Sequence, residues 1–325
     1  MTLRLIHLEL KRLRDFMEIT ANLEWAKKSP YERFFDFIAM DADRFGILLE
    51  QLEKYNLNSL VVTINGNRHI FIFPNGVNLK LTAGDKFPFR GKKPVILAAH
   101  YDRVPGSPGA NDNSVAVFLL LKAALYLNEL GKNNWIIIFT DKEELKRGEK
   151  IKDQGSFSLT KKLVLLGLVN AQIFNFDACG SGNTFVFSNT VDYLLRKKIG
   201  FKYMQTGKTI AYLKNKALIT ANYLNLKNVL LAPVPFSDDA GFLRGGIPAQ
   251  TITMLPTDEA KPFAFQLLNQ FDFAEQIILN KVKDAKDKRF YPQTWRYLNS
   301  PYDTYLHLTP EYFEKIVRFA VELCR

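Results

Sequence analysis

The chain has 325 residues, of which 47% are hydrophobic and 26 are phenylalanine, so it can bury the core of one large domain or two small ones. This composition excludes a disordered or fibrous protein. The formal charge of +11 is compatible with a nucleic-acid partner, but basic residues alternate with acidic ones, as in segment 281–289, and we therefore expect no nucleic acid.

Segment 1–56 at the N-terminus has apolar residues at helical spacing and few helix breakers. We expect a helical extension that packs on the rest of the chain. Charges interrupt the apolar positions of residues 1–19, unlike a signal peptide, and no run approaches the roughly 18 apolar residues of a membrane span. Cys179 and Cys324 form no disulfide framework. We therefore expect a cytoplasmic protein with no membrane contact.

Two β-rich runs follow, at 59–64 and 68–73. They lie on either side of Asn65-Gly66, a dipeptide typical of a tight hairpin turn. Segment 94–100 is a short continuous apolar run that ends in polar residues. Such a run indicates a strand that is buried on both faces of a sheet.

The rest of the chain alternates helical and strand patterns. Helical patterns occur at 114–131 and 156–168, and buried strands are expected at 135–140, 171–177 and 247–255. This alternation is typical of a doubly wound sheet with right-handed crossovers. The last segment, 309–325, predicts an amphipathic helix with Thr309 as its N-cap. Because no linker divides the sequence, we predict a single α/β domain over 1–325, with three layers, a mostly parallel central sheet and helices on both faces.

Side chains that can bind a metal follow three of the predicted strands and precede one helix. They are His100 and Asp102 after the first strand, Asp112 before the helix, Glu143 and Glu144 after the second strand, and Asp177 after the third. Ligands of open α/β sheets bind outside the carboxyl ends of the strands, so these side chains should meet at one place. An imidazole with several carboxylates suits a divalent ion, and zinc favours that mixture.

Each of these residues has an ordinary explanation when it is considered alone. A histidine at a strand end is more often hydrogen-bonded than metal-bound, paired glutamates are usually surface charge, and Asp112 could be a helix cap. Asp102 gains a specific role only beside His100, as the carboxylate that orients a metal-binding imidazole. Suitable residues at three strand ends and at the helix start together favour the metal site.

Five motifs resemble those of one known family. They are AAHYDRVPGSPGANDNS (98–114), FTDKEEL (139–145), NFDACGSG (175–182), FSDDAGFLRGGIPA (236–249) and NSPYDTYLHLTP (299–310). From about residue 92 to the C-terminus, the sequence resembles the co-catalytic zinc aminopeptidases of metallopeptidase family 28, which share their fold with the animal glutaminyl cyclases. Residues 1–56 carry no recognisable match.

The resemblance implies a zinc-binding role for four residues. His100 and Asp177 would bind the first zinc ion. Asp112 would bridge to a second ion, which Glu144 would also bind. The bridging aspartate of this family is typically followed by a cis peptide bond, which predicts such a bond between Asp112 and Asn113.

The resemblance also implies hydrolysis of peptides from a free N-terminus. Glu143 would act as the general base on a zinc-activated water, and Asp102 would orient His100. We therefore expect peptide substrates and zinc as the cofactor.

The sequence departs from the family pattern at the last metal ligand, where Asn299 replaces the usual histidine. An amide oxygen is a poorer zinc ligand than imidazole, so we expect one zinc to be held firmly and the second site to be weakened. His307 could substitute for the missing ligand, whereas His69 and His7 are expected to be structural or exposed. Two further departures are Asp239, at a position where relatives usually have histidine, and the basic insertion at 145–153.

Three functions remain open. The leading hypothesis is a zinc-dependent aminopeptidase. A catalytically degenerate relative that acts as a binding or scaffolding protein is the first alternative, suggested by Asn299 and Asp239. A glutaminyl cyclase-like acyltransferase is the second, but its single zinc would need Asp112, Glu144 and the missing histidine. Retention of Glu143 beside Glu144 favours catalysis, because burying adjacent carboxylates is costly.

Overall fold

The computed structural model describes residues 43–77, 88–90, 92–196, 207–270, 272–279 and 288–325. Within the predicted helical segment 1–56, the described part forms helix α4, Arg44–Lys54. The Asp43 side chain accepts a hydrogen bond from the Gly46 backbone N–H and so caps this helix. The predictions for residues 1–42, and for 281–287 of the basic segment, lie outside the described residues.

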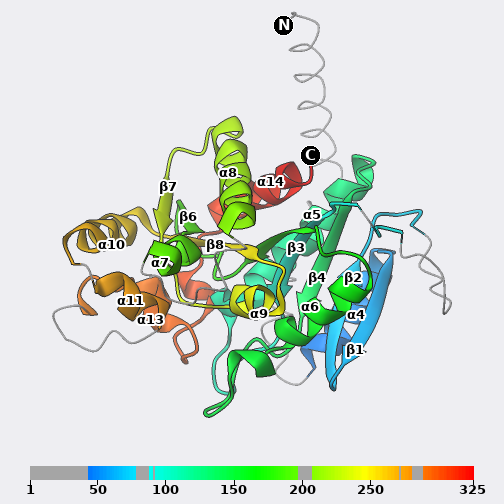
Figure 1. Ribbon diagram of the computed structural model, residues 1–325, viewed down its shortest axis with the longest axis horizontal. Helices are drawn as coiled ribbons and strands as arrows, with labels where there is room; N and C mark the ends of the chain where they lie inside the picture. The colour runs from blue at the N-terminus through cyan, green and yellow to red at the C-terminus, as the bar shows by residue number, and fades with distance from the viewer. Residues whose placement is uncertain (1–42, 78–87, 91, 197–206, 271, 280–287) are drawn as a thin grey trace, which may run out of the picture.

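Eight strands form one mixed sheet with the order β1-β2-β4-β3-β5-β8-β6-β7 (Figure 1). Their bounds are β1 Ser59–Ile64, β2 Asn67–Ile72, β3 Val95–His100, β4 Trp135–Thr140, β5 Gln172–Phe176, β6 Thr184–Ser188, β7 Val229–Ala232 and β8 Ala249–Leu255. The central strands β4, β3, β5 and β8 are mutually parallel. Because helices cover both faces of these strands, their residues are buried almost without interruption, as expected for strands in the middle of such a sheet.

Antiparallel pairing occurs toward both edges of the sheet. Strands β1 and β2 form the predicted hairpin, with Ile64 opposite Asn67. Asn65 and Gly66 at the turn have φ angles of 52° and 84°, which the tight hairpin turn requires. Strand β2 then pairs antiparallel with β4. At the other edge, β6 pairs antiparallel with β8 and parallel with β7, and the sequence patterns did not predict β6 or β7.

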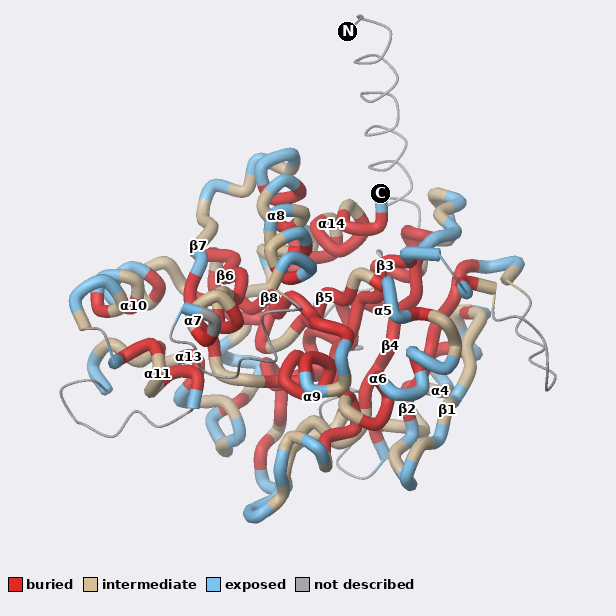
Figure 2. Tube along the Cα trace, in the orientation of Figure 1, coloured by how far each residue is buried: buried red, intermediate tan, exposed pale blue. Residues whose placement is uncertain are grey.

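Helices form the outer two layers. After α4 they are α5 Val115–Glu129, α6 Gly155–Leu165, α7 Thr190–Arg196, α8 Gly207–Tyr223, α9 Asp238–Gly245, α10 Thr257–Asn269, α11 Phe273–Ile278, α13 Gln293–Tyr297 and α14 Phe313–Leu323. Helices α4, α5, α8 and α14 pack on one face of the sheet. Helices α6 and α9 pack on the other face, and α10, α11 and α13 pack against β6, β7 and β8. The three-layer α/β/α prediction is confirmed, and Figure 2 shows the buried strands between the helices.

The C-terminal helix differs from its prediction at its start. A short 3-10 turn occupies Pro310–Tyr312, and α14 begins only at Phe313. The Thr309 side chain does not cap a helix, because its hydroxyl accepts a hydrogen bond from the Gly182 backbone N–H at 2.7 Å. None of the helices in the described ranges combines the length and apolar character that a membrane span needs.

Candidate metal centre

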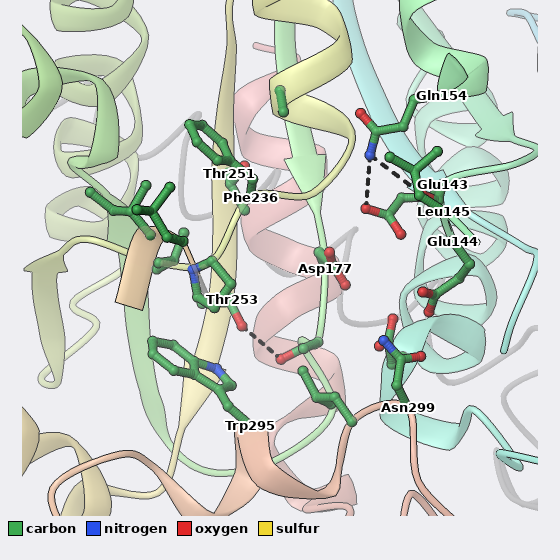
Figure 3. Close-up of a pocket in the computed structure, with 18 of the residues that line it drawn as sticks. Glu143, Glu144, Leu145, Gln154, Asp177, Phe236, Thr251, Thr253, Trp295 and Asn299 are labelled. Atoms are coloured by element: carbon green, nitrogen blue, oxygen red, sulfur yellow. Dashed lines mark hydrogen bonds between the residues drawn. The ribbon is translucent and has the colours of Figure 1, made fainter. Parts of the chain in front are cut away.

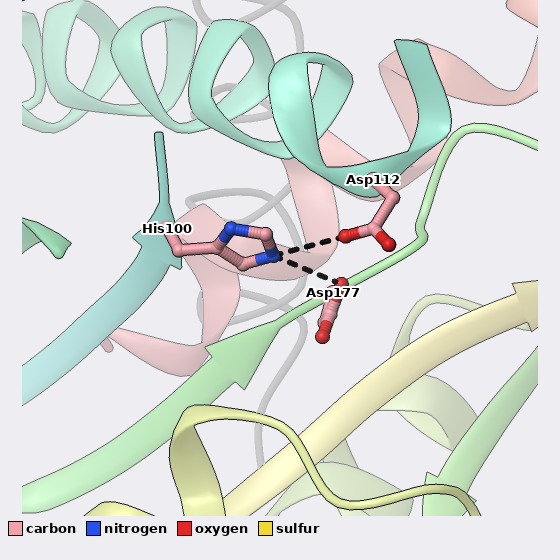
Figure 4. Close-up of side chains that lie close together, drawn as sticks. All are labelled: His100, Asp112 and Asp177. Carbon is pink, nitrogen blue, oxygen red and sulfur yellow. Dashed lines mark ion pairs between the residues drawn. The ribbon is translucent and has the colours of Figure 1, made fainter. Parts of the chain in front are cut away.

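His100 ends β3 and is fully buried. Its Nε2 atom lies 3.0 Å from Oδ1 of Asp112 and 3.6 Å from Oδ1 of Asp177, as Figure 4 shows. Burial opposes protonation of this imidazole, but contacts with three carboxylates hold its pKa well above the ordinary value. The parallel pairing of β3 with β5 explains why residues distant in the chain meet here.

Asp112 lies in the turn that connects β3 to α5. The peptide bond from Asp112 to Asn113 is cis, as predicted. The Asp303 carboxylate fixes this turn, because its two oxygens accept hydrogen bonds from the backbone N–H groups of Asn111 at 2.8 Å and Asp112 at 3.0 Å. The Asn113 side chain donates to the carbonyl oxygen of Phe176 at the end of β5. The turn is therefore held both through its backbone N–H groups and through a side chain.

Asp102 connects His100 to the turn that follows β4. Its Oδ1 atom lies 3.4 Å from Nδ1 of His100, on the ring edge opposite Asp112. The same carboxylate accepts hydrogen bonds from the backbone N–H groups of Glu143 at 3.1 Å and Glu144 at 3.0 Å. Burial opposes ionisation of Asp102, but these contacts lower its pKa below the ordinary value.

Glu143 and Glu144 follow β4 and line one cavity (Figure 3). Burial raises the pKa of Glu143 well above its usual range, and burial with neighbouring carboxylates raises the pKa of Glu144 to about 8. Gln154 is also buried, and its Nε2 atom donates to Oε1 of Glu143 at 3.2 Å. The Glu143 carboxylate is thereby held at the cavity wall.

Three donor atoms are close enough together to surround one metal ion. Atoms of His100, Asp112 and Asp177 all lie within 4.8 Å of one another. One nitrogen with two carboxylate oxygens suits zinc. In the described part of the chain, the buried Oε1 atom of Glu144 has no hydrogen-bond partner. Because carboxylates gathered in a buried site repel one another, a divalent cation would stabilise this arrangement.

The metal donors lie at one end of a cavity of about 440 Å³. The polar end is lined by Asp112, Glu143, Glu144, Asp177 and Asn299. The remaining wall is largely apolar and includes Val234, Pro235, Phe236, Ile278, Leu279, Tyr291, Trp295 and Leu298. Figure 3 shows Trp295 and Phe236 across the cavity from Glu143 and Glu144. The cavity can therefore hold a small ligand that has one polar and one apolar end.

Asn299, His307 and His69 lie in three different places relative to the cavity. Asn299 lies at the exposed edge of the cavity, with a φ angle of 58°. His307 packs its ring against Tyr297, with ring centroids 4.4 Å apart, and is not among the residues that line the cavity. His69 is buried in β2, and burial lowers its pKa to about 4.

The two other departures from the family pattern also have defined positions. Asp239 is buried at the start of α9, where it accepts a hydrogen bond from the Ser237 backbone N–H at 2.9 Å. Burial raises the pKa of Asp239 to about 7. Within the insertion 145–153, Leu145 and Ile151 line the cavity. This insertion therefore forms part of the cavity wall.

Three residues that contact the site were not identified from the sequence. Asp303 lies inside a motif that was recognised, but no role was assigned to it. Gln154 follows the insertion, and Arg44 lies in α4, whose helical pattern gives no sign of a contact with residues far along the chain. No local sequence signal identifies Gln154 or Arg44, because their partners are brought to them only by the fold.

Comparisons with solved structures find an aminopeptidase and a glutaminyl cyclase with the same fold. BSAP, a zinc aminopeptidase from Bacillus subtilis, is 18% identical, with a TM-score of 0.49, and the alignment covers 79% of this chain and 48% of that one. The chain thus spans about half the length of BSAP. The LapA aminopeptidase of Legionella pneumophila is 14% identical, with 91% and 70% covered and a TM-score of 0.57. The Porphyromonas gingivalis glutaminyl cyclase is 14% identical, with 91% and 96% covered and a TM-score of 0.58.

A search of curated proteins found no match. The model of one protein family, Peptidase family M28, matches residues 79–324. This range includes every residue of the candidate metal centre, from His100 to Asp303, and excludes α4 and the β1–β2 hairpin. The match extends over most of the sequence, and the chain belongs to peptidase family M28.

Proposed function

We propose that the protein is a zinc-dependent aminopeptidase that removes N-terminal residues from peptides. The observation that supports this most directly is the group of His100, Asp112 and Asp177, whose donor atoms lie within 4.8 Å of one another beside a cavity with an apolar wall. Membership of peptidase family M28 makes peptides the expected substrate class.

His100, Asp112 and Asp177 would hold the first zinc ion, and Asp102 would keep the His100 imidazole in the required orientation. When bound, zinc supplies polarisation of the scissile carbonyl and lowers the pKa of water to roughly 7. Glu144 would serve a second, weaker metal position, because Asn299 offers only an amide oxygen there.

Glu143 has the environment of a general acid–base group. Burial raises the pKa of Glu143, and a zinc ion beside it would act in the opposite direction. A carboxylate in this position could take a proton from water and return it to the leaving amine. The Glu143 carboxylate lines the same cavity as Asp112 and Asp177. The hydrogen bond from Gln154 limits the orientations that this carboxylate can adopt.

The cavity also indicates which substrates would fit. A volume of about 440 Å³ lies within the range of small-molecule sites and is too small for a folded protein chain. The apolar wall around Phe236, Leu279 and Trp295 would receive the first side chain of the peptide. We therefore expect faster cleavage after apolar N-terminal residues than after charged ones.

Hydrolysis of aminoacyl anilides, measured together with zinc content, tests this function. The wild-type protein should release the aniline, and a chelator should stop the reaction. Glu143→Gln should retain zinc but lose about 10²–10⁴-fold in kcat, the usual contribution of a general base. Glu149→Gln is the matched control, because Glu149 lies in the same loop and pairs with Lys142 at 3.1 Å.

Three results would contradict the proposal. Hydrolysis that persists in Glu143→Gln and in excess chelator would rule out the mechanism. A zinc-loaded wild-type protein that cleaves no anilide or N-terminally free peptide would instead favour the degenerate, binding function. Release of ammonia from a peptide with N-terminal glutamine, without peptide cleavage, would favour glutaminyl cyclisation.

A further inference from the structure

Arg44 extends from α4 into the protein behind the metal centre. Its side chain is only 7% exposed, although it comes from a helix outside the family match at 79–324. The Nη1 atom donates to the carbonyl oxygen of Tyr101 at 3.2 Å, and Nη2 donates to that of Pro108 at 2.8 Å. One guanidinium therefore joins two points that are separated by seven positions in the chain.

These two carbonyl groups lie at the two ends of the loop that we call the ligand loop, residues 101–109. Tyr101 is the residue between His100 and Asp102, and only Gly109 separates Pro108 from the turn Ala110–Ser114 that contains Asp112. The guanidinium also lies close to the backbone of Gly109. A Cβ atom added at Gly109 would lie 3.2 Å from Nη2 of Arg44 and 2.8 Å from the carbonyl oxygen of Asp112. The ligand loop, the Asp112 turn and Arg44 are therefore closely packed.

Helix α4 is itself firmly anchored, so it can serve as a fixed support. Leu48 and Leu52 are buried in the same core as α5 and α14. Phe45 packs against the same core, and the Arg68 guanidinium stacks over its ring at 3.8 Å. The Phe45 ring also lies 6.2 Å from the ring of Tyr101. The planar fork of an arginine on such a helix can hold two acceptors at a fixed separation, which lysine cannot do.

The Arg44 cation is attracted by the carboxylates of Asp102, Asp303 and Asp112, not by a metal. Burial lowers the pKa of Arg44 to about 10, so the side chain remains a cation at neutral pH. A cation beside the site repels a bound divalent ion, and on charge alone its removal would strengthen metal binding. A role in holding the ligand loop predicts the opposite effect.

We propose that Arg44 is a positioning residue that fixes both ends of the ligand loop, and that α4 is therefore an integral part of the metal centre. The link to metal binding rests on the proposed function. The link to the loop rests only on the two hydrogen bonds and the burial of the guanidinium.

Hydrogen exchange of the metal-free protein tests the loop directly. Arg44→Met keeps much of the apolar stem and removes both hydrogen bonds. It should speed exchange of the Ser107 and Gly109 amides about tenfold or more, because these amides are hydrogen-bonded within the loop. Arg68→Met is the matched control, since it removes a guanidinium that stacks on Phe45 of α4 but keeps the Arg68 backbone carbonyl oxygen, which accepts the hydrogen bond from the Tyr101 hydroxyl. Equal exchange in the two variants would overturn the proposal.

Zinc affinity and the visible spectrum of the cobalt-substituted protein test the metal link. Arg44→Met should weaken zinc binding about 10–100-fold, the usual effect of losing a group that orients ligands, and should change the cobalt spectrum. Arg44→Lys keeps the charge but not the fork, and should weaken zinc binding at least about threefold. Unchanged or tighter binding in Arg44→Met, or wild-type affinity in Arg44→Lys, would overturn the positioning role. If the wild-type protein bound no zinc, the proposed function would fail, and the exchange comparison would still decide whether Arg44 holds the loop.

Discussion

The Asp102 carboxylate accepts a hydrogen bond from the backbone N–H of Glu143 at 3.1 Å. The other Asp102 oxygen accepts the N–H of Glu144, and the same side chain lies 3.4 Å from the His100 ring. A single carboxylate therefore sets the position of the imidazole that we propose as a metal ligand relative to the proposed base. The orientation of His100 and that of the turn after β4 depend on the same group.

Asp102→Asn should weaken zinc binding about 10–100-fold. The backbone N–H groups of Glu143 and Glu144 bind different oxygens of Asp102, so in asparagine one of them would face an NH₂ group instead of an acceptor. A competition titration with a coloured chelator measures the affinity. Asp153→Asn is a suitable control, because Asp153 accepts a backbone hydrogen bond in the nearby loop and makes no contact with His100. Affinity within twofold of wild type would contradict the orienting role.

Gln154→Leu should lower kcat about tenfold and leave KM within about twofold of wild type. The substitution removes the donor that restrains the Glu143 carboxylate, and imprecise placement of a base slows proton transfer more than it weakens binding. Steady-state kinetics on one anilide substrate separate the two parameters. An unchanged kcat, with the protein still folded, would show that Gln154 does not position Glu143.

Asp239→Asn should change how stability depends on pH. Burial raises the pKa of Asp239 from 3.8 to about 7 in the folded protein. The unfolded chain therefore releases this proton as the pH rises through about 4, while the folded protein retains it up to about 7. In wild type this group makes the free energy of unfolding fall as the pH rises across that window, by at most roughly 1.4 kcal/mol for each pH unit.

Because asparagine does not titrate, the stability of Asp239→Asn relative to wild type should increase between about pH 4 and pH 7 and then level off. Urea unfolding in the presence of a chelator, at pH 5 and pH 7.5, measures the difference. Parallel stability curves for the two proteins would show that Asp239 is already ionised at low pH.

Asn299→His should raise the zinc content from one ion per chain toward two. Asn299 lies at the edge of the cavity that Glu144 and Asp112 also line, and imidazole is a better zinc ligand than an amide oxygen. Its φ angle of 58° is one that histidine adopts more readily than most residues do. Elemental analysis after dialysis gives the ratio. If this ratio stayed at one, the position of residue 299 would not explain the weak second site.

Much of the central sheet could be predicted because its strands are buried on both faces. The strands that end at His100, Thr140 and Phe176 consist mainly of apolar residues, and polar residues follow each of them. The Asn65-Gly66 turn could be predicted because few dipeptides suit its backbone angles. The positions of the candidate ligands then follow from the parallel order of the strands.

The other parts of the fold and of the candidate site depend on contacts between residues far apart in the chain, which no short segment of sequence specifies. Strand β7, Val229–Ala232, is apolar throughout, but a run of four residues is too short for its pattern to distinguish a strand from part of a helix or loop. Threonine is a common helix-capping residue, but the Thr309 hydroxyl instead accepts a hydrogen bond from the backbone N–H of Gly182. Arg44 is one charged residue in an amphipathic helix, and its partners lie 57 and 64 positions later in the chain. The cavity wall likewise combines residues from many separate elements.

Anomalous scattering at the zinc absorption edge, from crystals grown with zinc, tests the central claim most directly. The proposed site predicts a peak about 2.0–2.2 Å from Nε2 of His100 and from carboxylate oxygens of Asp112 and Asp177. Any second peak should be weaker and lie beside Glu144. Crystals that show no peak among His100, Asp112 and Asp177, although zinc is present, would contradict the claim that these residues form the metal centre.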